Sequence, residues 1–165
     1  MGDKRITLSE KLMKELIEKA LLMRERSYCP YSGFSVGAAL LTEEGRIYGG
    51  CNIENASYST TICAERVAMA KAVSEGEYRF RAIAIAGGKE KVPDVYSFPC
   101  GSCRQFMREF CDSGTFTVIV AKTAQDYKIY TLEELLPDSF GPEALELRTG
   151  NAAACEAGFR SYYGL

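Results

Sequence analysis

Apolar side chains recur at helical spacing near the start of the chain. Between Ser9 and Arg26 they return every three or four positions, which is the spacing of one face of an amphipathic helix. Thr7 or Ser9 is a suitable N-cap, because a side-chain hydroxyl there can accept a free backbone N–H. The first predicted element is therefore a helix whose apolar face packs on a core.

Short apolar runs beyond this helix are typical of strands, and stretches with helical spacing separate them. We expect strands over residues 36–41, 46–51, 81–86, 116–121 and 128–130, and helices over 63–73, 102–111 and 132–136. A turn over 42–45 would make the first two strands a hairpin, Thr61 would cap the second helix, and Gly87 with Gly88 would end the third strand. Strands that alternate with helices in this way predict a three-layer α/β/α fold with a central mixed β-sheet of about five strands.

Composition and charge narrow the ligands that such a domain would bind. The length of 165 residues suits one domain, and 47% hydrophobic with 25% charged residues are ordinary values for a globular protein. The formal net charge is -2, and the basic residues are scattered among acids, so we expect no nucleic-acid partner. No stretch approaches the ~20 apolar residues that span a bilayer, so no membrane partner is expected either. A small, weakly charged ligand fits best.

The chain contains seven cysteines and no histidine. Met1 to Lys19 lacks the apolar core of a signal peptide, which favours a reducing, cytoplasmic setting where cysteines bind metals, catalyse or stay buried. Without histidine, a zinc site must be built from thiolates and carboxylates. Proton transfer would then fall to Glu, Asp, Cys, Lys or Tyr.

Three cysteines and one glutamate form a pattern that suits catalytic zinc. Cys100 and Cys103 are two residues apart, and Cys63 would supply a third thiolate. Three ligands leave the fourth tetrahedral position open, which distinguishes a catalytic from a structural site. All three cysteines fall at predicted helix N-termini, where free N–H groups and the helix dipole favour thiolate. Glu65 lies beside one ligand and is a candidate proton shuttle.

Three thiolates leave the zinc site with a negative charge that needs to be offset. Arg66 and Gln105 each lie close in sequence to a ligand, and a hydrogen bond from Arg66 to a thiolate would withdraw charge from sulfur. The Cys-x-x-Cys pair alone would also fit a redox pair or half of a structural zinc site. The two motifs together favour catalytic zinc.

These motifs resemble the cytidine deaminase family, in its homotetrameric form with three cysteine ligands. Zinc deaminases pair H-x-E with P-C-x-x-C and allow three cysteines as the ligand set. Here Cys63-Ala64-Glu65 stands in the first position, and the further matching stretches are residues 31–39, 51–58, 61–66, 99–105 and 135–142. The resemblance implies hydrolytic deamination of cytidine and 2′-deoxycytidine to uridine and 2′-deoxyuridine with release of ammonia, as in pyrimidine salvage.

The resemblance also implies roles for individual residues. Cys63, Cys100 and Cys103 would bind one zinc ion per chain, and Glu65 would shuttle protons as zinc-bound hydroxide attacks C4 of the pyrimidine. The residues that would contact substrate are Phe34 on the base, Asn52 and Glu54 on the ribose, Tyr58, Ala64 through its backbone, and Phe140. Phe140 would reach the site of a neighbouring subunit, so the homotetramer would share its active sites. Residues i and i+2 at a strand end project from one face, which agrees with a shared grip of Asn52 and Glu54 on one sugar.

Other interpretations stay open at this point. A deaminase of a cytosine nucleoside antibiotic (blasticidin-type) shares both motifs, and a non-catalytic zinc-binding module would use the same ligands. A polynucleotide-editing deaminase fits the acidic balance less well. The resemblance predicts a cytidine deaminase-like domain over 1–146 and a C-terminal extension of unknown role over 147–165. Within this extension, the residues themselves suggest a short helix over 151–158.

Overall fold

The computed structural model describes residues 8–145. The elements follow the chain as α1 (Glu10–Arg24), β1 (Ser35–Thr42), β2 (Ile47–Cys51), η1 (Tyr58–Thr60), α2 (Ala64–Ser74), β3 (Phe80–Gly88), α3 (Gly101–Phe110), β4 (Thr117–Ala121), β5 (Tyr127–Thr131), α4 (Leu132–Leu135) and η2 (Pro142–Leu145). Each helix and strand predicted within these residues is present, with bounds within two residues of the prediction. The extension 147–165 and its predicted helix lie outside the described residues.

One five-stranded sheet organises the molecule, with strand order β2-β1-β3-β4-β5. The β3–β4 pair is parallel, and the other three pairs are antiparallel. The predicted mixed sheet is therefore confirmed. The register places Ser35 opposite Gly88 and Gly37 opposite Cys51, so the start of β1 and the ends of β2 and β3 lie at one end of the sheet.

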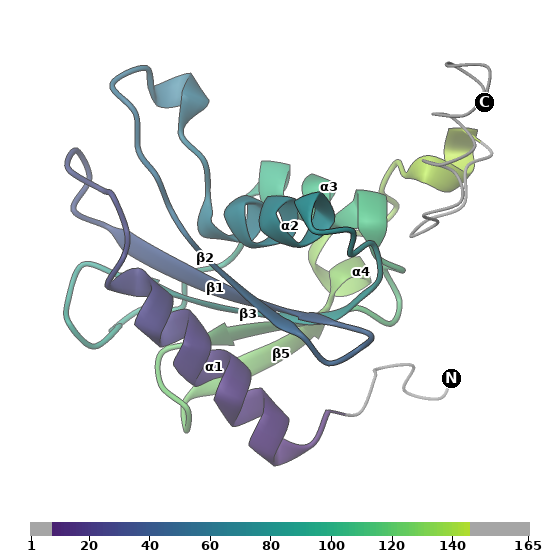
Figure 1. The fold of residues 1–165 in the computed structure, drawn as a ribbon, viewed down its shortest axis with the longest axis horizontal. Helices are drawn as coiled ribbons and strands as arrows, with labels where there is room; N and C mark the ends of the chain where they lie inside the picture. Colours follow the sequence, from purple (N-terminus) through teal and green to yellow (C-terminus); the bar gives the residue numbers. More distant parts are fainter. Residues whose placement is uncertain (1–7, 146–165) are drawn as a thin grey trace.

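The helices cover both faces of this sheet (Figure 1). Helix α1 lies on one face, and α2, α3 and α4 lie on the other. The strands alternate their side chains between two cores, as a period of two requires. The face of α2 and α3 buries Ala38, Leu40, Ile83, Ile85, Val118 and Val120. The face of α1 buries Ala39, Leu41, Ala82, Ala84, Ile119 and Ala121. The three-layer α/β/α fold is therefore as predicted.

Small residues let the helices approach the sheet closely. A Cβ at Gly37 would lie 2.0 Å from the carbonyl oxygen of Ala20, so only glycine fits under α1 at this point. Ser9 is the N-cap of α1 and accepts a hydrogen bond from the Leu12 N–H at 3.3 Å. Of the two predicted caps, Thr7 and Ser9, it is therefore Ser9 whose hydroxyl accepts the free backbone N–H.

Two local predictions are wrong. Thr61 does not cap α2: the N-cap is Cys63, and the Thr61 hydroxyl instead accepts a hydrogen bond from the Asn55 N–H at 3.2 Å. The strand β3 does not stop before Gly87 and Gly88: they are its last two residues and pair with Val36 and Ser35 of β1. The neighbouring strand therefore extends the ladder through both glycines. Within residues 8–145, no helix is both long and apolar enough to cross a bilayer.

Candidate metal centre and substrate site

Three cysteine sulfur atoms meet where α2 and α3 begin. Cys63 and Cys100 are the N-caps of these helices, and Cys103 lies in the first turn of α3. The Sγ atoms of Cys63 and Cys100 are 3.9 Å apart, those of Cys100 and Cys103 are 3.5 Å apart, and all three lie within 4.8 Å of one another. Tetrahedral zinc with bonds of about 2.3 Å to sulfur requires sulfur atoms about 3.8 Å apart. The three thiols therefore fit one zinc ion, and within residues 8–145 no fourth metal-binding side chain joins their cluster.

The start of α2 is held against the sheet by a glycine. A Cβ at Gly50 of β2 would lie 2.3 Å from the carbonyl oxygen of Ala64 and 2.5 Å from the backbone nitrogen of Ala68. These are backbone atoms in the first turns of α2, so the helix rests directly on the strand. The start of α3 is fixed by Arg104, whose Nε donates to the Pro99 carbonyl at 2.8 Å. Both ligand-bearing helix starts are thus tied to neighbouring backbone.

Glu65 lies in the first turn of α2 and is only 4% exposed. Burial raises the pKa of this carboxyl to about 7, and the charge of Cys63 acts in the same direction. Its side chain also hydrogen-bonds to Cys103. A carboxyl that exchanges its proton near neutral pH can serve as a base in one step and as an acid in the next.

The thiols are polarised by their neighbours. A hydrogen bond from Cys103, helped by Arg66 and Cys100, lowers the pKa of Cys63 to about 5, and in return the pKa of Cys103 is raised. The Nη2 atom of Arg66 lies 3.9 Å from the Cys63 sulfur and donates to the Thr61 carbonyl at 2.9 Å. The guanidinium thus places positive charge beside an all-thiolate ligand set.

Glu54 faces a cavity of about 290 Å³ that Tyr31, Ser32, Tyr58 and Thr61 also line. Its carboxylate accepts hydrogen bonds from the backbone N–H groups of Tyr31 (2.9 Å) and Ser32 (3.2 Å) and from the Ser32 hydroxyl. These bonds lower the pKa of Glu54, the Ser32 hydroxyl contributing most. The carboxylate is therefore an ionised hydrogen-bond acceptor at the cavity wall.

The Asn52 side chain connects this region to β1. Its Oδ1 accepts from the Val36 N–H at 2.8 Å, and its Nδ2 donates to the Phe34 carbonyl at 2.9 Å. Phe34 is half-buried beside the Gly87 backbone, where a Cβ would lie 3.1 Å from its ring. Asn52 therefore fixes the backbone on both sides of Ser35 and, with it, the position of the Phe34 ring.

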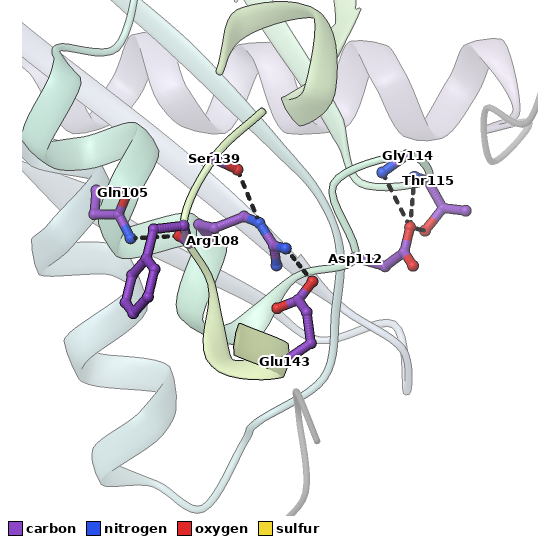
Figure 2. Close-up of polar contacts among 8 residues, drawn as sticks. Gln105, Arg108, Asp112, Gly114, Thr115, Ser139 and Glu143 are labelled. Atoms are coloured by element: carbon purple, nitrogen blue, oxygen red, sulfur yellow. Dashed lines mark hydrogen bonds and ion pairs between the residues drawn. The ribbon is translucent and has the colours of Figure 1, made fainter. Parts of the chain in front are cut away.

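The other two aromatic candidates are exposed. Tyr58 is 72% exposed and its ring meets that of Tyr31 edge-on, with centroids 5.6 Å apart. Phe140 is 63% exposed and is not among the residues that line the Glu54 cavity. Gln105 lies two residues after a metal ligand in sequence, but its Nε2 donates to the Phe140 carbonyl at 3.0 Å (Figure 2).

Comparisons with known proteins agree with this geometry. The family described as "Cytidine and deoxycytidylate deaminase zinc-binding region" matches residues 10–120. The cytidine deaminase of Sporosarcina psychrophila is 46% identical over 81% of this chain and 94% of its own length, and that of Halalkalibacterium halodurans is 48% identical over 78% and 93%. The crystal structure of cytidine deaminase from Burkholderia pseudomallei has a TM-score of 0.69 at 42% identity, covering 76% of this chain and 97% of that one.

The chain belongs to the cytidine deaminase family.

Family membership excludes two of the interpretations that the sequence left open. This cytidine deaminase family member is a zinc-dependent hydrolytic deaminase, and its zinc fits Cys63, Cys100 and Cys103. The predicted enzyme class and cofactor are therefore confirmed. A redox pair and a non-catalytic zinc module are both set aside.

Two residues of the site were given no role from the sequence. Ser32 hydrogen-bonds to Glu54 and also accepts from the Phe34 N–H at 2.9 Å. It stands inside the stretch 31–39 that carries the resemblance, and its position before Gly33, which has a φ of +65°, indicates a turn. Arg108 of α3 contacts the segment that carries Phe140, and nothing in its local sequence indicated this contact.

Proposed function

We propose that this chain converts free cytidine and 2′-deoxycytidine to uridine and 2′-deoxyuridine with release of ammonia. The main observation in support is the buried Glu65 carboxyl, which lies against the three-cysteine cluster. A proton carrier beside an open metal position is the arrangement that hydrolytic removal of an amine requires. The relatives named cytidine deaminases, matched over more than nine tenths of their length, support the substrate.

Cys63, Cys100 and Cys103 would hold the zinc, which when bound supplies Lewis-acid activation of water at its fourth position. Glu65 accepts one proton from the attacking water as the water oxygen bonds to C4, and it donates that proton to N3. Glu65 then takes the proton of the new C4 hydroxyl and delivers it to the amino nitrogen. The C4–N bond breaks with its electron pair on nitrogen, so ammonia leaves and uridine retains N3–H and a C4 carbonyl.

The surrounding residues would orient the nucleoside. Glu54 lines the cavity as an ionised acceptor, and Asn52 retains one amide hydrogen beyond its bond to the Phe34 carbonyl, so both can bind ribose hydroxyls. The Phe34 ring would pack on the base. Ala64 is the first residue of α2, and its backbone N–H has no partner within the helix, so it is free for the pyrimidine. Arg66 would offset the negative charge of the three thiolates.

An exposed apolar surface supports assembly into a homotetramer. Tyr31 and Tyr58 are in ring contact, Tyr28 bridges to Ile53, and Ile53 bridges to Ile62. All five side chains are at least 42% exposed. Several large apolar side chains exposed on neighbouring segments are typical of a subunit interface. We therefore infer that Tyr58 and Phe140 complete active sites that are shared between chains.

A direct assay tests the proposed function. The purified protein, with its zinc content measured, is given cytidine, 2′-deoxycytidine, blasticidin S or a cytosine-containing single-stranded oligonucleotide, and ammonia release is followed. We expect turnover of the first two and little of the others. Turnover of blasticidin S or the oligonucleotide alone would refute the substrate, and no turnover by the zinc-loaded protein would refute the function.

The shared site is tested by mixing two variants of low activity. Glu65→Gln chains lack the proton carrier and Phe140→Ala chains lack the aromatic side chain. Co-refolded mixtures should regain activity, since some sites then combine an intact Glu65 with an intact Phe140. Activity that stays at the sum of the two variants would contradict sharing.

The proposal also places the reaction in pyrimidine salvage in the cytoplasm, where a reducing environment keeps the three ligand thiols free.

A further inference from the structure

Two residues of α3 bind the segment that carries Phe140. Gln105 and Arg108 lie three residues apart and so share one face of the helix. Gln105 donates to the Phe140 carbonyl at 3.0 Å, and Arg108 Nε donates to the Ser139 hydroxyl at 3.0 Å. Arg108 Nη2 forms an ion pair with Glu143. Figure 2 shows these contacts between α3 and the segment from Ser139 to Glu143. One helix face therefore holds this segment on both sides of Phe140.

Arg108 is the buried member of this contact. Its side chain is 7% exposed, whereas that of Glu143 is 60% exposed. A buried guanidinium needs partners, because an unpaired charge away from water is unfavourable. Both partners available in the described residues belong to the same short segment. The position of Arg108 is therefore coupled to the backbone path of residues 139–143.

Gly141 makes the contact tight. A Cβ at this position would lie 2.5 Å from Arg108 Cζ and 2.6 Å from a carboxylate oxygen of Glu143. The backbone of the segment thus lies directly against the guanidinium, without room for a side chain between them. Asp138, just before the segment, has a φ of +48° in the left-handed region. The chain enters the contact through a turn that ordinary residues adopt rarely.

The Phe140 side chain contrasts with its backbone. Its carbonyl is bonded and both neighbouring residues lie in the Arg108 contact, yet its ring is 63% exposed. Within residues 8–145, the ring makes no aromatic contact. A fixed backbone under a free apolar side chain lowers the entropy lost when that side chain enters a partner surface. This is the expected arrangement for an anchor that binds outside its own chain.

We propose that Arg108 is a positioning residue of deamination, which fixes the Ser139–Glu143 segment so that Phe140 reaches the nucleoside site of a neighbouring chain. The inference rests on the proposed function, because it requires Phe140 to contact that site. Helix α3 carries Cys100 and Cys103 at one end and Arg108 near the other. One rigid helix would therefore relate the metal centre of one chain to the aromatic residue that it presents to the next.

The test is a pair of steady-state measurements on zinc-loaded protein, with and without Phe140. Arg108→Met keeps the length of the side chain and removes its donors. We expect it to raise the KM for cytidine about tenfold with kcat little changed, because the segment must then be ordered on binding. In a Phe140→Leu background the same substitution should change KM by less than about twofold, since the residue through which it acts is already altered.

Two further variants keep the test decisive. Glu143→Gln breaks the same ion pair by changing its exposed partner, and it should also raise KM. This variant keeps the test valid even if Arg108→Met folds poorly. Arg46→Met is the matched control, because it breaks the ion pair between Arg46 and the buried Glu77. Arg46 directly precedes β2, at the opposite end of that strand from Cys51. This control should lower the melting temperature and leave KM unchanged.

Three outcomes would overturn the inference. The first is an equal rise in KM from Arg108→Met in both backgrounds. The second is loss of stability with an unchanged KM in both Arg108→Met and Glu143→Gln. The third is a Phe140→Leu variant with wild-type KM, which removes the role of Phe140 while deamination by Glu65 and zinc remains. Failure of the wild-type protein to deaminate cytidine is a separate result, and it refutes the proposed function itself.

Discussion

A methyl group added at Gly50 tests whether the α2 start must lie where the structure places it. In Gly50→Ala the new Cβ would be 2.3 Å from the Ala64 carbonyl oxygen and 2.5 Å from the Ala68 nitrogen. Non-bonded heavy atoms make optimal contact at about 3.5 Å, so α2 must retreat by about 1 Å. Overpacking of this kind costs about 1–3 kcal/mol of stability. A displacement of about 1 Å at a catalytic group can lower the rate by about 10²-fold.

The assay compares Gly50→Ala with Gly49→Ala in melting temperature, zinc content and kcat/KM for cytidine. Gly49 is the adjacent residue on the other face of β2, where a Cβ would meet only side-chain atoms of Met23 and Lys19. These flexible side chains can move aside, so we expect this control to cost less than about 1.5 kcal/mol and to keep its activity. Wild-type kcat/KM in Gly50→Ala, or equal losses in both variants, would refute the reasoning.

Three further predictions concern the site directly. Glu65→Gln should keep one zinc per chain and lose about 10²–10⁴-fold in kcat, because the amide cannot carry the proton; kinetics with metal analysis check this, and substantial turnover would count against it. Cys100→Ala should lose both zinc and activity, and full metal content in that variant would contradict the ligand set. Arg66→Gln should weaken zinc binding about 10–100-fold in a chelator competition, because the charge beside Cys63 is removed; unchanged affinity would exclude the proposed role.

The elements of the fold follow closely from apolar periodicity. The burial of Ala38 and Leu40 on one face and of Ala39 and Leu41 on the other is the direct result of strand geometry. The cysteine site could also be predicted from the sequence, because Cys63 and Cys100 fall at helix starts that the pattern predicts. Local sequence therefore determined both the elements and the residues at their ends.

The failures come from contacts between distant segments. Two adjacent glycines, Gly87 and Gly88, predict the end of a strand, yet β1 pairs with both of them. Because β1 is distant in the sequence, the residues around the glycines do not indicate this pairing. Thr61 is a good helix cap by residue type, but the cysteine two residues later occupies the N-cap position. The contact of Arg108 with residues 139–143 spans more than 30 positions, so its discovery required the folded chain.

Both metal-bearing helices begin at a ligand instead of at an ordinary cap. Cys63 and Cys100 are N-caps without a side-chain capping hydrogen bond, so a bound metal–thiolate cluster would compensate the positive ends of the α2 and α3 dipoles. Loading with metal and ordering of these helix starts then become a single linked equilibrium. Zinc starvation would consequently remove more than turnover: it would increase local opening at this end of the sheet and expose the chain there to proteolysis and thiol oxidation. Metal supply would in this way control the lifetime of the protein as well as its rate.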